Sequence, residues 1–543
     1  MIDVNALVDK IGSWQVPVFL LIIFRSWPLG FHILFLSFAA SAKQDHWCAR
    51  PEKFLDKFSV DEWKDQAVPL VNGKFSRCLV RKWVEENDRV RFLNETEKCT
   101  DWEYDTTYYD WTLLREFGLV CDNSWRVSAS QASFMAGIMA GNVIFAKIAD
   151  RHGRRKSLLY STLLMIIAGF ITVFCRDYWS FNVARFAISI ACGAYQCTIL
   201  SLLMECLSAK KRSWAMLSSF GWTTGTVMLP WIAYFFPNWI HQQIIYAASA
   251  IPCLFVWIFL PESPRWLLAS GRVDKAEVAI GNLVRKNKLD VDVAKLFKEY
   301  RESHDAQEGT KAEVSETSRP TYGDLFRGPQ MRIRSICILI MYFANRLLMF
   351  HLTFFAARMG GNPFWGFTLV GLLTAPSDLV AVFCIRFVKR RPAMFVTFMG
   401  TGMFILLLVP FGEDQFMARV VLCTLAKSLN SIGACSLGVF ATESFPTVVR
   451  AIGIGSAYTS SRFGAMFSPF FKELTDFAGP AFAAGVSVAI AVMGAVSSLL
   501  LPETLNQTLP DTLADVDPDV YTPVNTEMKD GKAVTTKKHS IPT

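Results

Sequence analysis

The chain of 543 residues lacks the sequence features that enzymes and nucleotide-driven machines usually need. It has no glycine- and lysine-rich loop that would cradle phosphates, and its seven histidines are scattered rather than spaced as paired metal ligands. We therefore expect no enzymatic activity, no metal site and no cofactor. The energy for any work that the protein does is then expected from gradients or exchange, not from bound ATP.

Charged residues are also scarce, at 19% of the chain, whereas 52% of the residues are hydrophobic. Apolar runs long enough to cross a bilayer recur about twelve times, and a helix crosses economically because it satisfies its own backbone. The sequence therefore predicts an all-α membrane protein with twelve transmembrane helices. The expected spans are residues 17–40, 127–149, 157–175, 180–207, 214–236, 242–260, 332–356, 364–387, 394–411, 416–441, 449–471 and 479–501.

No cleavable signal peptide is evident, because the first run is too long for the apolar core of one. The net charge of +8 does not indicate a nucleic-acid partner either. Basic residues gather in short segments that alternate with the spans, as the positive-inside rule predicts for cytoplasmic segments. These segments are residues 150–156, 208–212, 265–334 and 386–391.

Polar segments divide the spans into two bundles of six helices each. We expect an N-terminal bundle over residues 17–260, which includes an outer loop at 41–126, and a C-terminal bundle over 332–501. The remaining segments are a cytoplasmic N-terminus, linker and tail. They are residues 1–16, 261–331 and 502–543, with helical spacing at 274–301, a flexible stretch at 303–320 and a disordered tail.

The loop at 41–126 carries two signals of an extracellular location. It contains four cysteines, Cys48, Cys78, Cys99 and Cys121, which predict two disulfides in one of three possible pairings. It also contains the glycosylation acceptor Asn94-Glu95-Thr96. A second acceptor motif at Asn506 is discounted, because it falls on the expected cytoplasmic side.

Three pairs of residues recur along the chain at nearly the same spacing. Arg154 corresponds to Arg390 within basic turns, Glu205 to Glu443 at the ends of apolar runs, and Glu262 to Glu503 within Leu-Pro-Glu motifs. A common spacing indicates two tandem halves of the same topology, which is typical of transporters built from parallel repeats.

A series of motifs then identifies a family. In order they are Asp45-His46-Trp47-Cys48, residues 118–125 (GLVCDNSW), 133–137 (SFMAG), the turn at 150–156 (DRHGRRK), 261–266 (PESPRW), 443–450 (ESFPTVVR) and 501–504 (LPET). Together they cover about residues 15–515. The chain resembles the organic ion transporter family of the major facilitator superfamily, which includes organic cation, organic anion and carnitine transporters.

The sequence departs from this family in the basic turns. Ala146 stands where the family usually has Gly, and the second turn has Arg386, Phe387 and Lys389 where Asp, Arg and Gly are expected. We therefore expect a weaker or rewired cytoplasmic cluster in the second half.

The resemblance implies that charges at the cytoplasmic ends of the spans form gating ion pairs. Glu205 and Glu443 are expected within reach of the basic turns. The candidate gating residues are Asp150, Arg151, Arg154, Arg155, Glu205, Glu262, Arg265, Arg390, Arg391, Glu443 and Arg450.

Charges near the middle of a span are expensive to bury and indicate a functional site. Arg346, Asp378 and Arg462 occupy such positions in the second half, and Lys427 is a further central cation that looks like a general family feature. By resemblance, Arg462 aligns with a position where cation transporters carry Asp and anion or carnitine transporters carry Arg. A guanidinium in a partly dry cavity suits a carboxylate or sulfate.

Asp378 aligns with a position where anion transporters often carry Lys, and it leaves two interpretations open. It could hold the amine or quaternary ammonium of a zwitterion while Arg462 holds the carboxylate, or it could neutralise Arg346, Lys427 or Arg462 as a buried pair. The three cations exceed the one anion, which favours anions or zwitterions over plain cations.

Aromatic residues complete the candidate site. Phe220 and Trp222 lie in the fifth span, where the family lines its cavity with rings, although packing against lipid or protein explains most aromatics in such a chain. Asn345 and Arg346 stand where many anion transporters have paired Tyr, which indicates an unusual substrate.

The sequence thus predicts a plasma-membrane transporter of small organic anions or zwitterions, such as carnitine-like or amino-carboxylate compounds, that works by alternating access. Its partners are the substrate, the bilayer and a coupling ion or exchange substrate. One alternative is a polyspecific organic cation transporter that uses Asp378. The other is a non-transporting membrane receptor on the same scaffold.

Overall fold

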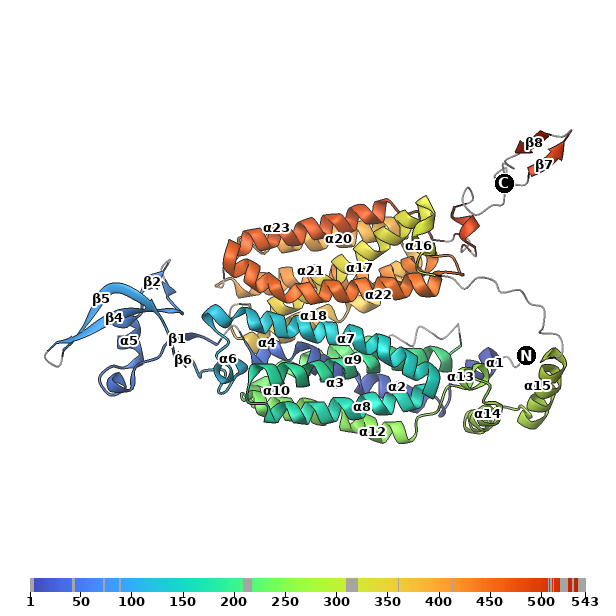
Figure 1. Ribbon diagram of the computed structural model, residues 1–543, viewed down its shortest axis with the longest axis horizontal. Coiled ribbons are helices and arrows are strands. Elements are labelled where there is room, and N and C mark those ends of the chain that lie inside the picture. Colours follow the sequence, from blue (N-terminus) through green and yellow to red (C-terminus); the bar gives the residue numbers. More distant parts are fainter. Residues whose placement is uncertain are drawn as a thin grey trace.

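The computed structural model describes residues 4–41, 44–71, 74–86, 89–208, 217–308, 321–359, 361–412, 414–505, 507, 510, 512–517, 526–529 and 532–535. Two helical bundles lie side by side, with a small strand-containing domain at one end and short helices at the other (Figure 1). The first bundle comprises α2 (Val16–Phe24), α3 (Ser26–Leu34), α4 (Leu36–Ala39), α7 (Trp125–His152), α8 (Arg154–Ile171), η3 (Thr172–Phe174), α9 (Tyr178–Cys206), α10 (Leu217–Phe235), α11 (Trp239–Ala248) and α12 (Ile251–Ile258).

The second bundle repeats this pattern with the later part of the chain. It comprises α17 (Pro329–Ala356), α18 (Pro363–Thr374), α19 (Ser377–Phe387), α20 (Arg390–Leu407), α21 (Phe416–Ser444), α22 (Arg450–Phe467), η6 (Ser468–Phe470) and α23 (Phe471–Leu499). Nine segments of the described chain are long and apolar enough to cross a membrane, and α10 and α20 add two more of the expected spans. One of the nine, Arg450–Leu499, contains two expected spans, separated where Gly479 leaves helical geometry at φ 85°. All twelve expected spans are therefore helical over most of the residues that the structure describes in them.

Close packing within the first bundle depends on small residues. A Cβ atom on Gly193 of α9 would lie 2.2 Å from the carbonyl oxygen of Ile138 on α7, and one on Gly141 of α7 would lie 2.1 Å from Ile190 O on α9. Helices in a membrane gain little from the hydrophobic effect between them, so this close backbone approach supplies van der Waals contact instead.

The loop at 41–126 is a folded domain rather than an irregular loop. Trp47, Phe54 and Trp63 form its small apolar core. Its elements are β1 (His46–Cys48), η1 (Glu52–Phe54), α5 (Val60–Ala67), β2 (Leu70–Val71), β3 (Lys74–Phe75), β4 (Leu79–Glu86), β5 (Arg89–Lys98), β6 (Trp102–Tyr104), α6 (Leu113–Glu116) and η2 (Cys121–Asn123). β1 pairs antiparallel with β6, β2 with β3 and β4 with β5.

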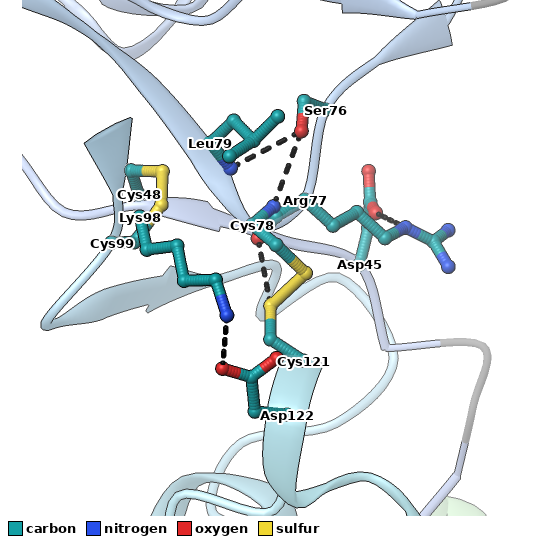
Figure 2. Close-up of a disulfide and its surroundings, with 10 residues drawn as sticks. All are labelled: Asp45, Cys48, Ser76, Arg77, Cys78, Leu79, Lys98, Cys99, Cys121 and Asp122. Atoms are coloured by element: carbon teal, nitrogen blue, oxygen red, sulfur yellow. Dashed lines mark hydrogen bonds and ion pairs between the residues drawn. A yellow bond between two sulfur atoms is a disulfide. The ribbon is translucent and has the colours of Figure 1, made fainter. Parts of the chain in front are cut away.

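Two disulfides hold this domain, as the four cysteines predicted. Of the three possible pairings, the structure has Cys48–Cys99 and Cys78–Cys121 (Figure 2). The second bond ties the domain to η2, directly before α7, and Lys98 Nζ pairs with Asp122 Oδ2 at 2.8 Å beside it. The domain is therefore fastened to the start of the second span.

Short helices and the beginning of the tail lie at the opposite end of the molecule (Figure 1). They are α1 (Val4–Asp9), α13 (Pro264–Ala269), α14 (Val273–Asn287), α15 (Val293–Glu308), α16 (Asp324–Arg327) and η7 (Leu513–Asp515), followed by the antiparallel pair β7 (Thr526–Lys529) and β8 (Lys532–Thr535). Most of the stretch expected to be flexible, residues 303–320, lies outside the described residues, as does the acceptor Asn506.

The start of the tail differs from the disorder that its polar composition predicted. Asp517 is 3% exposed, and its carboxylate accepts hydrogen bonds from the backbone N–H groups of Gln330 and Met331 at 3.0 and 2.8 Å. These are free donors of the first turn of α17, which a carboxylate satisfies well. The contact with α17 thus orders the start of a segment for which the composition alone predicts disorder.

Candidate functional site

The two bundles contact each other at the end that carries the disulfide-bonded domain. Ser128 Oγ on α7 donates to Pro469 O at 3.2 Å and to Glu473 Oε1 on α23 at 3.0 Å. Aromatic rings close the other side of this end, where Trp231 on α10 meets Trp365 on α18 with ring centroids 4.9 Å apart. Packed rings and hydrogen bonds therefore join the two bundles at the loop-side end of the interface.

Deeper in the interface, a hydrogen bond of Arg462 links the halves. Its Nη2 on α22 donates to Gln196 Oε1 on α9, so a cation of the second half binds a neutral amide of the first. Arg462 Nε is buried, with no hydrogen-bond partner among the described residues. A guanidinium donor in this position costs about 1–3 kcal/mol until an acceptor reaches it.

Arg346 is the second cation of this region. Its Nη1 contacts Met349 Sδ at 3.1 Å, and a thioether is only a weak acceptor. Arg346 lies close enough to Arg462 for the two charges to repel, and both are near Tyr458. The structure therefore brings two of the predicted central cations near each other, and one of them, Arg462, bonds across to the first bundle.

Lys427 and Asn345 have different surroundings. Lys427 on α21 is half-buried, with its Nζ 6.0 Å from the centroid of the Phe367 ring on α18. Asn345 is 4% exposed and faces Asn430 on α21, with each Asn Nδ2 donating to the other residue's backbone carbonyl at 3.0 and 3.2 Å. These bonds fasten α17 to α21, so Asn345 has a structural partner already.

The two aromatic candidates on α10 differ in their surroundings. The ring of Trp222 is half-buried and packs over Gly30 of α3, where an added Cβ atom would lie 3.9 Å from it, whereas the Phe220 side chain is 61% exposed. Trp222 is therefore held by the first bundle, and Phe220 extends from it. The backbone of Asp378 lies in α19, but its side chain falls outside the described residues.

We call Asp150, Arg154, Arg155, Glu205 and Glu262 the first-half cluster. Arg154 Nη2 pairs with Glu205 Oε1 at 3.0 Å and its Nη1 with Asp150 Oδ1 at 3.0 Å. The Glu262 carboxylate accepts from the backbone N–H groups of Arg154 and Arg155 at 2.9 and 3.2 Å. Burial raises the pKa of Glu262, against the opposing effect of these donors.

The turn before this cluster needs its glycine. Gly153 has φ 104°, and a Cβ atom there would lie 2.5 Å from Glu262 Oε2. The missing side chain therefore allows the carboxylate to approach the first N–H groups of α8, where the helix dipole favours a negative charge.

We call Arg386, Arg390, Arg391, Glu443 and Glu503 the second-half cluster. Arg390 Nε pairs with Glu443 Oε2 at 3.2 Å, and Glu503 accepts from the backbone N–H groups of Arg390 and Arg391 at 2.9 and 3.2 Å. Burial pushes the pKa of Glu503 up, but four backbone N–H donors outweigh it and leave that pKa lowered. The Arg–Glu pair and the contacts to Glu503 therefore form without the Asp and Gly of the first turn. Among the described residues, Arg390 has no counterpart of the Arg154–Asp150 pair, and its Nη1 donates to the Val388 carbonyl at 3.3 Å, so the second cluster differs from the first in this contact.

The other predicted gating residues contact backbone groups nearby. Arg265 Nη2 donates to Leu207 O just after α9, and Arg450 Nε donates to Phe445 O just after α21, at 3.3 and 3.1 Å. Arg151 lies exposed near the end of α7, and its carbonyl accepts from Arg272 Nη2. Arg265 and Arg450 thus both contact a carbonyl just after the fourth span of their half, although Arg265 follows the sixth span and Arg450 follows the fourth.

Sequence reasoning missed Gln196 and the outer contact between Ser128 and Glu473. Gln196 is a neutral polar residue within an apolar run, and such a residue stands out far less than a charge. Its position opposite Arg462 depends on how the two halves face each other, which no local pattern reveals.

Comparisons with known proteins agree over nearly the whole chain. The model of the family described as "Sugar (and other) transporter" matches residues 82–513. An organic cation transporter protein of Drosophila melanogaster is 27% identical, over 93% of this chain and 92% of that protein. A β-alanine transporter of the same organism is 26% identical, over 93% of this chain and 87% of that protein.

A solved structure shares the fold. The xylose transporter XylE from E. coli superposes with a TM-score of 0.60 at 14% identity, over 92% of this chain and 100% of that one. The expected major facilitator fold, and with it a multi-pass membrane protein that is not an enzyme, is confirmed by these matches.

Proposed function

We propose that this chain, which belongs to the sugar (and other) transporter family of the major facilitator superfamily, carries small organic anions or zwitterions across the plasma membrane. The observation that carries the proposal is the pair of cations Arg462 and Arg346 at the interface of the two halves. Arg462 has a buried donor without a partner in the described structure, and an anionic group would satisfy it.

The places where the two halves touch support alternating access. The halves contact each other on the side of the disulfide-bonded domain, and Arg462 binds Gln196 at a deeper level. A carboxylate that reaches Arg462 competes with the amide of Gln196, so substrate binding changes a contact between the halves. Binding and rocking of the halves are thereby coupled, and a transport cycle requires such coupling.

A zwitterion with carboxylate and amine is our preferred substrate class. One relative is named as a transporter of β-alanine, which carries both groups, and another as an organic cation transporter. Asp378 of α19 would hold the amine while Arg462 holds the carboxylate. Asp378→Asn should then reduce uptake of amine-bearing substrates selectively, whereas equal loss for all substrates with poor surface expression would assign Asp378 to a structural pair.

The orientation that we propose places the disulfide-bonded domain outside the cell and both termini in the cytoplasm. Asn94 is exposed on β5 of that domain and available to a glycan. Glycosidase treatment should therefore shift the mobility of the wild-type protein but not of Asn94→Gln. A wild-type protein that does not shift would contradict this orientation or the use of this site.

Competitive uptake in expressing cells tests the function. The panel contains an organic carboxylate, a quaternary ammonium compound and a zwitterion with both groups. We expect the zwitterion to inhibit uptake most strongly. Stronger inhibition by the carboxylate would make Asp378 a structural counter-ion. Strongest inhibition by the ammonium compound would overturn the proposed role of Arg462. Ligand binding without flux would indicate a receptor instead.

A further inference from the structure

A cavity lies between the first bundle and the short helices α13 and α14, and Arg462 is not among its lining residues. Its volume is about 660 Å³, and the ends of α8 and α12 form its other walls. Six Arg and Lys side chains line it, together with His152. They are Arg155, Lys156, Arg272, Lys275, Arg285 and Lys286.

Among the residues that the structure describes, no carboxylate forms an ion pair with these cations. Glu262 is the one acidic residue of the described lining, and its carboxylate accepts from backbone N–H groups of the first-half cluster. Arg155 Nη2 donates to the Ile258 carbonyl, and Arg285 Nη2 donates to the Asn282 amide oxygen. The lining therefore holds a large positive excess, which favours a ligand with several negative charges.

The surroundings of the cavity indicate that this ligand is a lipid. Tyr160 on α8, Phe259 after α12 and Val278 on α14 line it with 44%, 69% and 66% of their surfaces exposed. Tyr160 and Phe259 stand at the ends of two membrane spans, where exposed apolar side chains face acyl chains or the bilayer interface, and Val278 extends this surface onto α14. The indole rings of Trp257 and Trp266 lie in the same wall, with Arg155 stacked 4.6 Å from the Trp257 ring centroid.

We propose that this cavity binds the headgroup of a phospholipid of the cytoplasmic leaflet that carries phosphate monoesters, as a phosphorylated inositol lipid does. A single phosphodiester supplies one negative charge, whereas each monoester adds nearly two and matches the six cations better. Bound there, the headgroup bridges Lys156 on α8 to Lys275 and Lys286 on α14. It would thus fasten the linker helices to the bundle beside the first-half cluster.

Binding of a short-chain lipid to the purified full-length protein tests this proposal. The probe is dioctanoyl phosphatidylinositol bisphosphate, and binding is measured by thermophoresis in detergent. Lys275→Gln/Lys286→Gln should bind about 30-fold more weakly, because each cation near a membrane surface contributes about 1 kcal/mol to such binding. Both side chains are exposed, so the variant is expected to fold, which size-exclusion chromatography checks.

The matched control is Lys295→Gln/Lys298→Gln, which removes the same charge from exposed positions of α15 outside the cavity. It should retain binding within about twofold of wild type. Equal losses in the two variants would overturn the site and leave only general charge attraction.

Two further probes separate the sources of phosphate. Dioctanoyl phosphatidylserine should bind at least tenfold more weakly than the bisphosphate, and equal binding would refute the need for monoesters. Soluble inositol trisphosphate should also bind more weakly, because it lacks acyl chains, and equal affinity would assign the cavity to a soluble polyphosphate. None of these measurements depends on uptake, so they succeed or fail separately from the proposed transport function.

Discussion

The two halves of the molecule share their cytoplasmic charge clusters but differ at their common interface. Arg154 with Glu205 and Arg390 with Glu443 form equivalent pairs, and in each half a Leu-Pro-Glu carboxylate accepts from two consecutive backbone N–H groups. At the interface, the first half offers Gln196, whereas the second offers Arg346 and Arg462. Under the proposed function, the repeated part serves the motion that both halves make, and the part that differs serves recognition.

The clusters also show which features of the turn matter. The second half lacks the Asp that corresponds to Asp150 and has Lys389 where Gly153 stands in the first half. Its Arg–Glu pair and backbone contacts form nonetheless. Asp150 is 74% exposed, and an exposed ion pair contributes only about 0–1 kcal/mol to stability. The buried arginine and the helix-capping glutamate are therefore the essential parts.

The largest effect should come from reversing the charge at the interface. Arg462→Asp should lower the uptake of carboxylates at least about 100-fold, because it replaces the cation that binds them with an anion. Uptake at matched surface expression measures this, with Arg462→Lys as a control that keeps the charge. Unchanged carboxylate uptake in Arg462→Asp would remove the proposed distinction between the halves.

Breaking the two clusters should have smaller and similar effects. Arg154→Ala and Arg390→Ala should each lower maximal uptake about tenfold, because the two arginine side chains are similarly buried at 12% and 7% exposure and each loses a charged hydrogen-bond partner. Asp150→Asn is the control and should remain within about twofold of wild type. A tenfold loss of uptake in only one of the two variants would show that the two clusters, although similar in geometry, differ in function.

The neutral side of the interface can be tested through Gln196. Gln196→Leu should lower the KM for carboxylates about fivefold, because the substrate no longer displaces an amide from Arg462. Uptake measured over a range of concentrations checks this, and Arg462→Lys/Gln196→Leu should show a smaller change. A raised KM would instead mean that Gln196 orients Arg462 for the substrate.

The smallest expected effect is on how the stability of the protein depends on pH. The pKa of Glu503 is lowered, so its contribution to stability is present above about pH 4.5 and is lost as pH falls through its folded-state pKa. The pKa of Glu262 is raised, so holding it ionised costs stability that acidification recovers.

Glu503→Gln should therefore lose less stability than wild type on acidification from about pH 6 to pH 4, and Glu262→Gln should lose more. We expect differences of below about 1 kcal/mol, or about 1–2 °C in the unfolding temperature. Thermal unfolding of the purified variants at each pH measures this. Parallel pH profiles for both variants would contradict the opposite environments of the two carboxylates.

Much of the fold could be predicted from the sequence, because the length of an apolar run and the spacing of Arg154, Glu205 and Glu262 are local signals. The two disulfide pairings could not, since four cysteines allow three connectivities. Gln196, and the Asn430 partner of Asn345, could not be found from the sequence for a related reason. Their surroundings depend on contacts between helices. In the sequence, a polar residue that hydrogen-bonds a neighbouring helix cannot be distinguished from one that is available to bind a ligand.

Because Asp517 is buried against the second bundle, a shortened or fused chain must extend past this residue to keep its contact. Its carboxylate lies against the first turn of α17, and a Cβ atom on Gly328 would come within 1.9 Å of it, so the chain and the carboxylate fit each other closely. Fluorescent or affinity fusions joined directly after residue 510 would remove this contact, whereas fusions joined well beyond Asp517 would keep it. The polar C-terminal segment thus begins as a structural part of the second bundle.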